Sequence, residues 1–203
     1  MVIEEATSLK PSMSLFREAR AGKGISYMRS YSSVTTATWE FPMLPPSPAN
    51  RYHVDHAERL RRTFHTLTGR DLVDPALAPD AAADVLFHAA FVVLSHNTAP
   101  DPLLTYGNQA ALNLFALTWE NLIQMPSRLT AEAPNQAGRA RLLAEVTARG
   151  YIDDYSGVRI SRTGQRFLIE RATVWNLTDA AGQRCGQAAM FREWRYLDNI
   201  SSG

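Results

Sequence analysis

The sequence has few of the residues on which several large classes of protein depend. Its single cysteine, Cys185, allows neither an intrachain disulfide framework nor a zinc site built from several cysteines. Its strongest apolar run, 89–94, has the length of a strand and falls far short of the roughly 18 residues that a membrane span needs. Residues 1–5 lack the basic start and apolar centre of a secretory signal. We therefore expect no membrane contact and a cytoplasmic location, with organellar targeting by residues 1–50 left open.

An excess of charge of one sign is also missing. The chain has 21 basic and 20 acidic side chains, and it contains no lysine after Lys23. The resulting net charge of +1 gives no overall field that would draw the chain to nucleic acid or to an anionic membrane. Neither a Walker phosphate-binding loop nor a dinucleotide-binding glycine motif is present. We expect no nucleic-acid partner.

The length of 203 residues is sufficient for one domain with tails. Residues 1–50 are rich in serine and threonine, contain a proline-rich stretch at 41–48, and show no lasting helical or strand period. This composition predicts a poorly ordered leader. Periodic hydrophobic patterns begin after it, so we place the domain at 51–196 and a short tail at 197–203.

Within the expected domain, hydrophobic spacing predicts helices and strands in a definite order. Ala57, Leu60 and Phe64 share one face of a helix over 52–68, which Gly69 would end. Asn108 is a good N-cap for a helix that runs to Leu117. The other expected helices cover 81–88, 119–124 and 135–150, and the expected strands cover 91–95, 103–106, 151–162, 166–177 and 184–196.

Two strands, a helical excursion and three strands joined by tight turns predict a five-stranded antiparallel sheet in an α+β fold. This arrangement resembles the PAS architecture. The aromatic strand end at Tyr106, followed by Asn108 and by a helix with Leu112 and Phe115, is similar to a PAS signature. A closer resemblance is to the MEKHLA-domain proteins, a PAS-like family. The segments that carry it are 65–72, 91–96, 104–115, 124–132, 155–161 and 174–177.

MEKHLA-domain proteins include stand-alone bacterial and algal members, and the plant members carry the domain at the C-terminus of class III homeodomain–leucine-zipper factors. The resemblance implies a PAS-like sheet with the helical excursion on one face and an N-terminal helix. Such a helix often mediates dimerisation in PAS-like proteins, so we expect a homodimer through the 52–68 helix. The DNA-binding role of the plant proteins is not implied, because residues 1–50 show neither a homeodomain nor a leucine zipper.

Five side chains are candidates for a pocket between the sheet and the helical excursion. Tyr106 would offer a hydroxyl group to a ligand if it pointed into the concave sheet. Arg128 lies in the excursion, four residues before a glutamate with which it can simply pair. An arginine on a strand, such as Arg159, must be paired or meet an anion if it faces inward. The full set of ligand-binding candidates is Tyr106, Arg128, Tyr155, Arg159 and Trp175.

The sequence specifies no cofactor. His53 and His56 share a helix face, but two ligands do not make a metal site and no later motif completes one, so we expect no metal. A haem ligand would belong on the helix before the last three strands, and residues 135–149 contain no histidine. A LOV-type flavin adduct needs a cysteine on the excursion, whereas Cys185 begins the last strand. A non-covalently held flavin stays open, and the cofactor is unknown.

We expect a sensory or protein-interaction module that binds a small molecule, dimerises or does both, and signals through a partner without catalysis. The alternative is a small α+β enzyme of the isomerase or cyclase type. Its acid–base pair would be His96 with Asp101 or Asp153 with Tyr106, and the chosen pair would have to converge in one cavity. A third interpretation is an interaction domain with a filled core, which a pocket smaller than roughly 300 Å³ would favour.

Overall fold

The computed structural model describes residues 44–197. Most of the expected leader lies outside this range, as does the tail beyond Leu197, although the first short helix starts before the expected domain boundary at residue 51. The helices are η1 (Pro48–His53), α1 (Val54–Thr68), α2 (Pro79–Phe87), α3 (Gln109–Phe115), α4 (Trp119–Leu122), η2 (Ser127–Thr130) and α5 (Ala133–Arg149). The strands are β1 (Val92–His96), β2 (Leu104–Gly107), β3 (Tyr151–Ile160), β4 (Arg166–Thr178), β5 (Arg184–Phe191) and β6 (Glu193–Tyr196).

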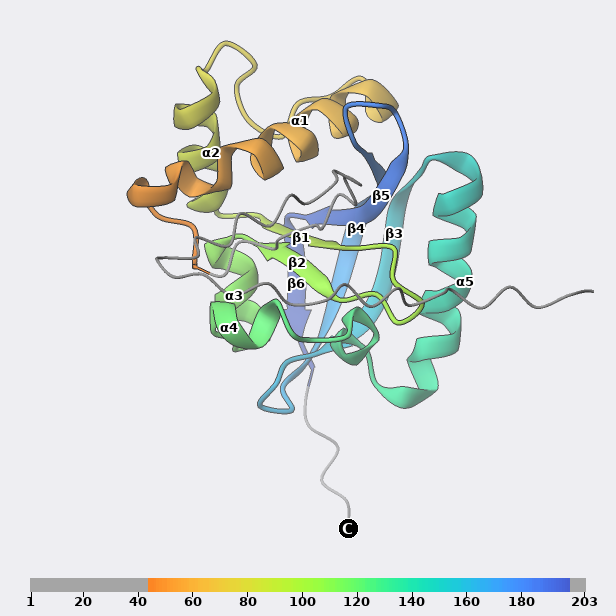
Figure 1. Cartoon of the computed structure of the whole chain (residues 1–203). Coiled ribbons are helices and arrows are strands. Elements are labelled where there is room, and N and C mark those ends of the chain that lie inside the picture. The colour runs from red at the N-terminus through yellow and green to blue at the C-terminus, as the bar shows by residue number, and fades with distance from the viewer. Residues whose placement is uncertain (1–43, 198–203) are drawn as a thin grey trace, which may run out of the picture. The chain divides into compact units, whose positions relative to one another are not determined.

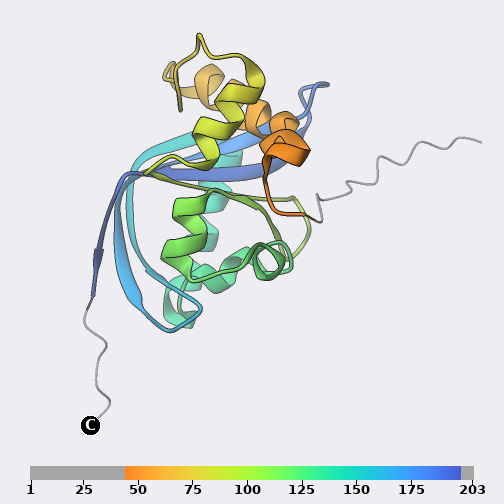
Figure 2. The ribbon, with the colours of Figure 1, turned by 90° about the vertical axis from the view of Figure 1, so that its left-hand side faces the viewer.

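The strands form one antiparallel sheet with the order β2-β1-β5-β4-β3, so the fold is α+β and PAS-like, as predicted. The sheet has six strands instead of the expected five. The predicted last strand breaks at Arg192, and its end leaves β1 to become β6, which pairs with the first half of β4. Helices α1 and α2 cover one face of the sheet, which we call the outer face (Figure 1). Helices α3, α4 and α5 lie against the other, concave face, which we call the inner face (Figure 2).

Helix α1 follows the predicted pattern closely. Its apolar residues Ala57, Leu60 and Phe64 are buried, and Gly69 ends it with a φ of 68°, a conformation that glycine adopts without strain. The apolar face of α1 therefore packs on its own sheet. None of the helices in residues 44–197 is long and apolar enough to cross a membrane.

Asn108 caps α3, as its position predicted. Its Oδ1 accepts hydrogen bonds from the backbone N–H of Ala111 at 3.1 Å and from that of Val93 at 3.0 Å. Its Nδ2 donates to the carbonyls of Phe91 at 2.7 Å and Leu86 at 3.3 Å. One fully buried amide thus joins α2 on the outer face, strand β1, and α3 on the inner face.

A bulge in β2 changes the direction in which its side chains point. Ser95 of β1 lies opposite Tyr106, whereas the next residue, His96, lies opposite Leu104, so Thr105 has no counterpart. An extra residue of this kind breaks the two-residue alternation of a strand. Leu104 therefore belongs to the inner cluster and Tyr106 to the outer one.

A second bulge lies in the middle of β4. Tyr155 of β3 pairs with Ala172, and Gly157 pairs with Ile169, so two β4 residues face the single residue between them. Arg171 has a φ of 50°, which is rare for a residue with a side chain. Residues before the bulge at odd positions, such as Ile169, face inward, and those after it, such as Trp175, face outward.

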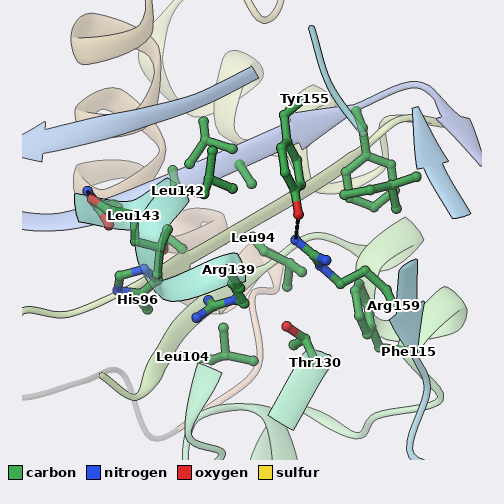
Figure 3. Close-up of a pocket in the computed structure, with 17 residues that line it drawn as sticks. Leu94, His96, Leu104, Phe115, Thr130, Arg139, Leu142, Leu143, Tyr155 and Arg159 are labelled. Atoms are coloured by element: carbon green, nitrogen blue, oxygen red, sulfur yellow. Dashed lines mark hydrogen bonds between the residues drawn. The ribbon is translucent and has the colours of Figure 1, made fainter. Parts of the chain in front are cut away.

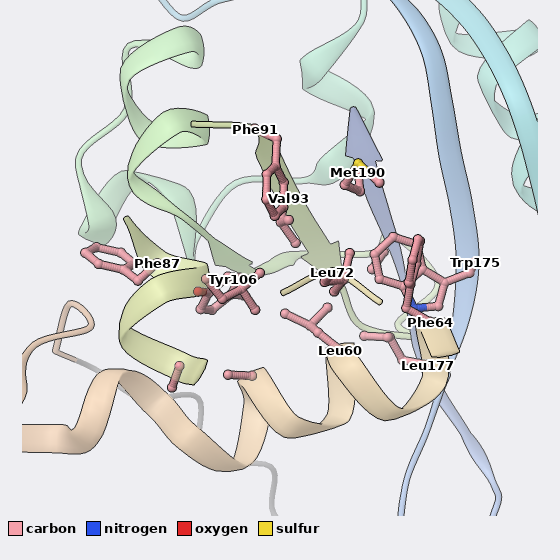
Figure 4. Close-up of a cluster of buried hydrophobic side chains, with 14 of the residues drawn as sticks. Leu60, Phe64, Leu72, Phe87, Phe91, Val93, Tyr106, Trp175, Leu177 and Met190 are labelled. Atoms are coloured by element: carbon pink, nitrogen blue, oxygen red, sulfur yellow. The ribbon is translucent and has the colours of Figure 1, made fainter. Parts of the chain in front are cut away.

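The outer face is closed by a tightly packed apolar group that we call the outer cluster. Phe64 of α1 meets Trp175 edge-on with ring centroids 5.0 Å apart, and the indole Nε1 donates to the Thr63 hydroxyl at 3.0 Å. Figure 4 shows α1 running below the cluster, with Phe87 and Tyr106 toward one end and Trp175 at the other. Its main members are Leu60, Phe64, Leu72, Val93, Tyr106, Trp175, Leu177 and Met190.

Candidate functional site

The inner face holds a partly open cavity of about 60 Å³ between the sheet and α5. Residues of strands β1 to β5, the end of α3, η2 and α5 form its walls (Figure 3). Most of the lining is apolar. The residues that line it include Leu94, His96, Phe115, Arg139, Leu142, Tyr155, Arg159, Ile169, Val174 and Phe191.

Two arginines reach this cavity. Arg159 of β3 is only 7% exposed, donating from Nη1 to the carbonyl of Val158 at 2.9 Å and from Nη2 to the hydroxyl of Tyr155 at 3.2 Å. Arg139 of α5 is half-buried, and burial together with the nearby charge of Arg159 lowers its pKa to about 10. Two cations are therefore held close enough to repel each other in a poorly solvated space.

Tyr155 reaches Arg159 because Gly157 stands between them on the strand. A Cβ atom at Gly157 would collide with the Tyr155 hydroxyl group and would crowd Nη1 of Arg159. The missing side chain lets the tyrosine lie along the strand, with its ring 5.3 Å from the Arg159 guanidinium carbon. The Tyr155 oxygen accepts from Arg159, so its own proton remains available to a ligand.

His96 supplies the complementary group, a buried acceptor. Its Nδ1 lies 2.8 Å from the carbonyl of Asn97, and because a carbonyl only accepts, this nitrogen carries the proton. Burial lowers the pKa of His96 to about 4, so the ring is neutral at pH 7 and Nε2 keeps a free lone pair. Nε2 is buried and has no partner among residues 44–197.

The cavity has no acidic side chain to balance these groups. None of its 17 lining residues is an aspartate or a glutamate. Within the described part of the chain, no carboxylate forms an ion pair with Arg139 or Arg159, whereas ten ion pairs hold other basic groups elsewhere. The site is therefore a small, mainly apolar space with a local excess of positive charge.

Two of the five candidate ligand residues line this cavity, namely Tyr155 and Arg159. Arg128 pairs with Asp101 at 3.1 Å on the surface, where both side chains are about half exposed. Tyr106 and Trp175 lie in the outer cluster, on the opposite face of the sheet. The two bulges, at Thr105 and Arg171, explain this placement, because each reverses the face that simple alternation assigns.

The residue pairs of the enzymatic alternative do not meet in one cavity. His96 lines the inner cavity, while Asp101 pairs with Arg128 on the surface. Asp153 accepts from Thr173 at 2.6 Å and pairs with Arg70 at 3.1 Å, and Tyr106 is buried in the outer cluster. Neither pair can act on a common substrate in this arrangement.

The cofactors considered from the sequence do not match the cavity. A volume of about 60 Å³ corresponds to a few water molecules and is far too small for a flavin or a haem. Cys185 packs at the edge of the outer cluster, where burial raises the pKa of its thiol. Within residues 44–197, no three His, Cys, Asp or Glu side chains gather closely enough to hold a metal ion.

Arg139 was missed by the sequence reasoning, although a signal was present. In the expected 135–150 helix, Leu142 and Val146 lie on one apolar face, and Arg139, three residues before Leu142, lies on the same face. A stripe that starts with arginine and continues with apolar residues places a cation over the sheet. For His96, the sequence suggested a catalytic pair with Asp101 and did not indicate a neutral hydrogen-bond acceptor.

A comparison with known protein families shows the family to which this chain belongs. The model of the MEKHLA domain matches residues 54–196, which is most of the chain. The chain belongs to the MEKHLA family. Curated relatives of this MEKHLA chain are the Arabidopsis thaliana homeobox-leucine zipper proteins ATHB-14, 27% identical over 143 residues, and ATHB-9, 27% identical over 129 residues. These matches cover 68% and 59% of this chain but only 17% and 15% of the plant proteins.

Solved structures with a similar fold include PAS and LOV proteins. The PAS domain of a Colwellia psychrerythraea protein has a TM-score of 0.49 and 12% identity, with 58% of this chain and 94% of that chain covered. An RNA-binding Light-Oxygen-Voltage receptor has a TM-score of 0.49 and 19% identity, with 63% and 35% covered. The MEKHLA assignment itself rests on the family match.

Proposed function

We propose that this MEKHLA chain is a sensory or protein-interaction module that holds a small molecule in the inner cavity and reports its presence to a partner without changing it chemically. The observation that carries the proposal is the construction of the cavity, whose walls come from both the sheet and α5. An occupant would touch both layers. A ligand that favours one packing of α5 over another shifts the population toward it, and the exposed side of α5 changes with it.

A second candidate is the interaction domain without a ligand. The cavity of about 60 Å³ is much smaller than the roughly 300 Å³ at which drug-sized ligand sites begin. Only a molecule of a few non-hydrogen atoms fits, and water alone can also occupy such a space. This size is the specific observation that favours the second candidate, and the experiment below separates the two.

The homodimer through the 52–68 helix and the cytoplasmic location remain part of the proposal. Because α1 uses Leu60 and Phe64 on its own sheet, a dimer would involve the remaining, more polar side of the helix, which includes Arg62 and His65. Light scattering on the full-length chain with and without bound ligand measures this directly. If the chain is monomeric at all concentrations, the homodimer is ruled out and the signalling partner must be a different protein.

The test uses this chain, first examined by native mass spectrometry and then screened by thermal unfolding against neutral, anionic and cationic compounds of up to about six non-hydrogen atoms. Ala189→Val narrows the cavity, because Ala189 lines it. Ala148→Val makes the same change on the exposed side of α5 and is the matched control. We expect a compound that raises the Tm of the wild type and of Ala148→Val but not that of Ala189→Val. If no compound of any charge gives this pattern, the ligand-binding function is ruled out and the interaction domain without a ligand is the better interpretation.

A further inference from the structure

We propose that the cavity binds a short-chain carboxylate, whose anionic head lies between Arg139 and Arg159 and whose carbon chain lies against the apolar wall. This inference rests on the proposed ligand-binding function and names the chemical class of the ligand. Four independent features of the site carry it: charge, hydrogen-bonding groups, size and apolar lining.

The first feature is unbalanced positive charge. Arg159 makes its described side-chain hydrogen bonds to two neutral oxygens, those of Val158 and Tyr155, and Arg139 lines the same space without a carboxylate partner in residues 44–197. Removing a guanidinium group from water is costly unless an opposite charge or hydrogen bonds replace the water. An anion in the cavity would compensate both cations and would also screen their mutual repulsion.

The second feature is the set of hydrogen-bonding groups around the head position. Figure 3 shows Tyr155 and Arg159 pointing toward each other, with Arg139 and His96 on the facing side. A guanidinium group presents a planar fork that matches the two oxygens of a carboxylate. The Tyr155 proton is free to donate a further bond.

The third and fourth features are size and apolar lining. About 60 Å³ has room for roughly four to six non-hydrogen atoms, since a bound water needs about 10–15 Å³ by a comparable measure. Leu142, Ile169, Val174 and Phe191 line the cavity together with the charged groups. A carboxylate with a chain of two or three carbons matches both the volume and this wall, whereas a phosphate ion offers nothing to the apolar side.

The unpartnered Nε2 of His96 adds a preference within this class. A buried acceptor without a donor is unfavourable, because folding has removed the water that would otherwise donate to it. A hydroxyl group next to the carboxylate would donate to this nitrogen, so a 2-hydroxy acid should bind more tightly than the plain acid of equal length. His96 is 7% exposed, and the described charged groups that influence it are Arg139 and Arg184.

The experiment titrates the full-length chain by calorimetry in a buffer free of carboxylates and phosphate. The probes are propionate, lactate, inorganic phosphate, propionamide as the neutral isostere, and propylamine as the cation. We expect propionate and lactate to bind, lactate more tightly, and the amide and the amine not to bind. Arg139→Gln should weaken carboxylate binding about 10- to 100-fold, the range expected when one charge-assisted hydrogen-bonding partner is lost.

Arg141→Gln is the matched control, because Arg141 lies two residues away on the same helix and is exposed. It should leave binding unchanged. Arg139→Lys keeps the charge but not the fork, and should recover only part of the affinity. The resonance of the Arg139 Nε–H group in a ¹⁵N spectrum should move on adding propionate, which locates the anion independently of any loss of stability.

The other outcomes separate this inference from the proposed function. If propionamide binds and propionate does not, the assignment of the ligand as a carboxylate is wrong, while the proposed ligand-binding function is retained. If phosphate binds as tightly as propionate, the site is a general anion site and the short-chain class is wrong. If none of the probes binds and the broader screen also gives nothing, both proposals fail. Equal losses in Arg139→Gln and Arg141→Gln would place the anion outside the cavity.

Discussion

The two faces of the sheet, although built from the same strands, differ in packing and in polarity. The outer face is closely packed, because Phe64, Tyr106 and Trp175 are at most 1% exposed between α1 and the sheet. The inner face keeps a cavity and sets Arg139 and Arg159 at its edge. We therefore expect the outer cluster to contribute more to stability than the cavity wall, and the cavity wall to supply the groups that bind.

The outer cluster should be the most sensitive part of the molecule. Trp175→Ala removes a fully buried indole together with its hydrogen bond to Thr63, and should lower the free energy of unfolding by about 3–5 kcal/mol. Urea unfolding measures the change. Trp194→Ala, on the partly exposed strand β6, is the matched control and should cost less than half as much. Equal costs would show that the outer face is not the main source of stability.

The amide that joins the two faces should come next. Asn108→Ala leaves the N–H groups of Val93 and Ala111 and the carbonyl of Phe91 without their partner in a fully buried place. We expect a loss of about 2–4 kcal/mol. Asn108→Asp should be no better, because a carboxylate would point at the carbonyls to which the amide now donates.

Thr118→Ala is the comparison for that change, because Thr118 also caps a helix but at an exposed position. It should cost about 1 kcal/mol or less. If Asn108→Ala costs no more than Thr118→Ala by urea unfolding, Asn108 is an ordinary cap and does not hold the faces together.

Each face also contains a histidine that folding keeps neutral. On the outer face, His56 lies 2.9 Å from the Ser95 hydroxyl and stacks on Tyr106, and burial, with smaller contributions from Arg59 and His53, lowers its pKa to about 3. On the inner face, burial lowers the pKa of His96 to about 4. Both values are far below the ordinary value of 6.5.

The sign of the resulting pH dependence follows from proton binding. Below pH 6.5 the unfolded chain binds protons at both positions and the folded chain does not, so stability falls as the pH falls. At pH 4.5 each histidine should lower the free energy of unfolding by about 2–3 kcal/mol relative to its value at pH 7.5. Urea unfolding across this range measures the slope. His56→Gln and His96→Gln should each flatten it, and an unchanged slope in both variants would contradict this assignment.

The inner histidine sharpens the comparison further, because the proposed carboxylate would interact with it and not with His56. Added propionate should make wild type less sensitive to acid at pH values where propionate is still an anion, because a negative charge beside His96 favours its protonated form in the folded chain. The same addition to Arg139→Gln should have little effect. A propionate effect that disappears in His56→Gln but not in Arg139→Gln would contradict the division between the two faces.

The order and position of the helices and strands were predictable because periodicity and turn residues are local properties. The predicted N-cap at Asn108 and the end of α1 at Gly69 are confirmed. The assignment of faces was less predictable. A bulge at Arg171 requires a positive φ at a residue that gives no glycine signal, and that single residue decides that Trp175 packs under α1 instead of facing the cavity. The partnership of Tyr155 and Arg159 likewise depends on long-range packing, although Gly157 between them marked a close approach.

The smallest expected effect on stability belongs to Arg139, the residue on which binding should depend most. A half-buried cation without a carboxylate partner in the described residues gains little from folding, so Arg139→Gln should change the free energy of unfolding by less than about 1 kcal/mol. Urea unfolding without added anion checks this. A residue that strongly stabilised the protein without ligand would already have its hydrogen bonds and its charge paired within the protein. It would then gain little by binding a ligand. A loss above about 2 kcal/mol would therefore show that Arg139 is part of the structural core, and that the inner face, like the outer one, is built for stability.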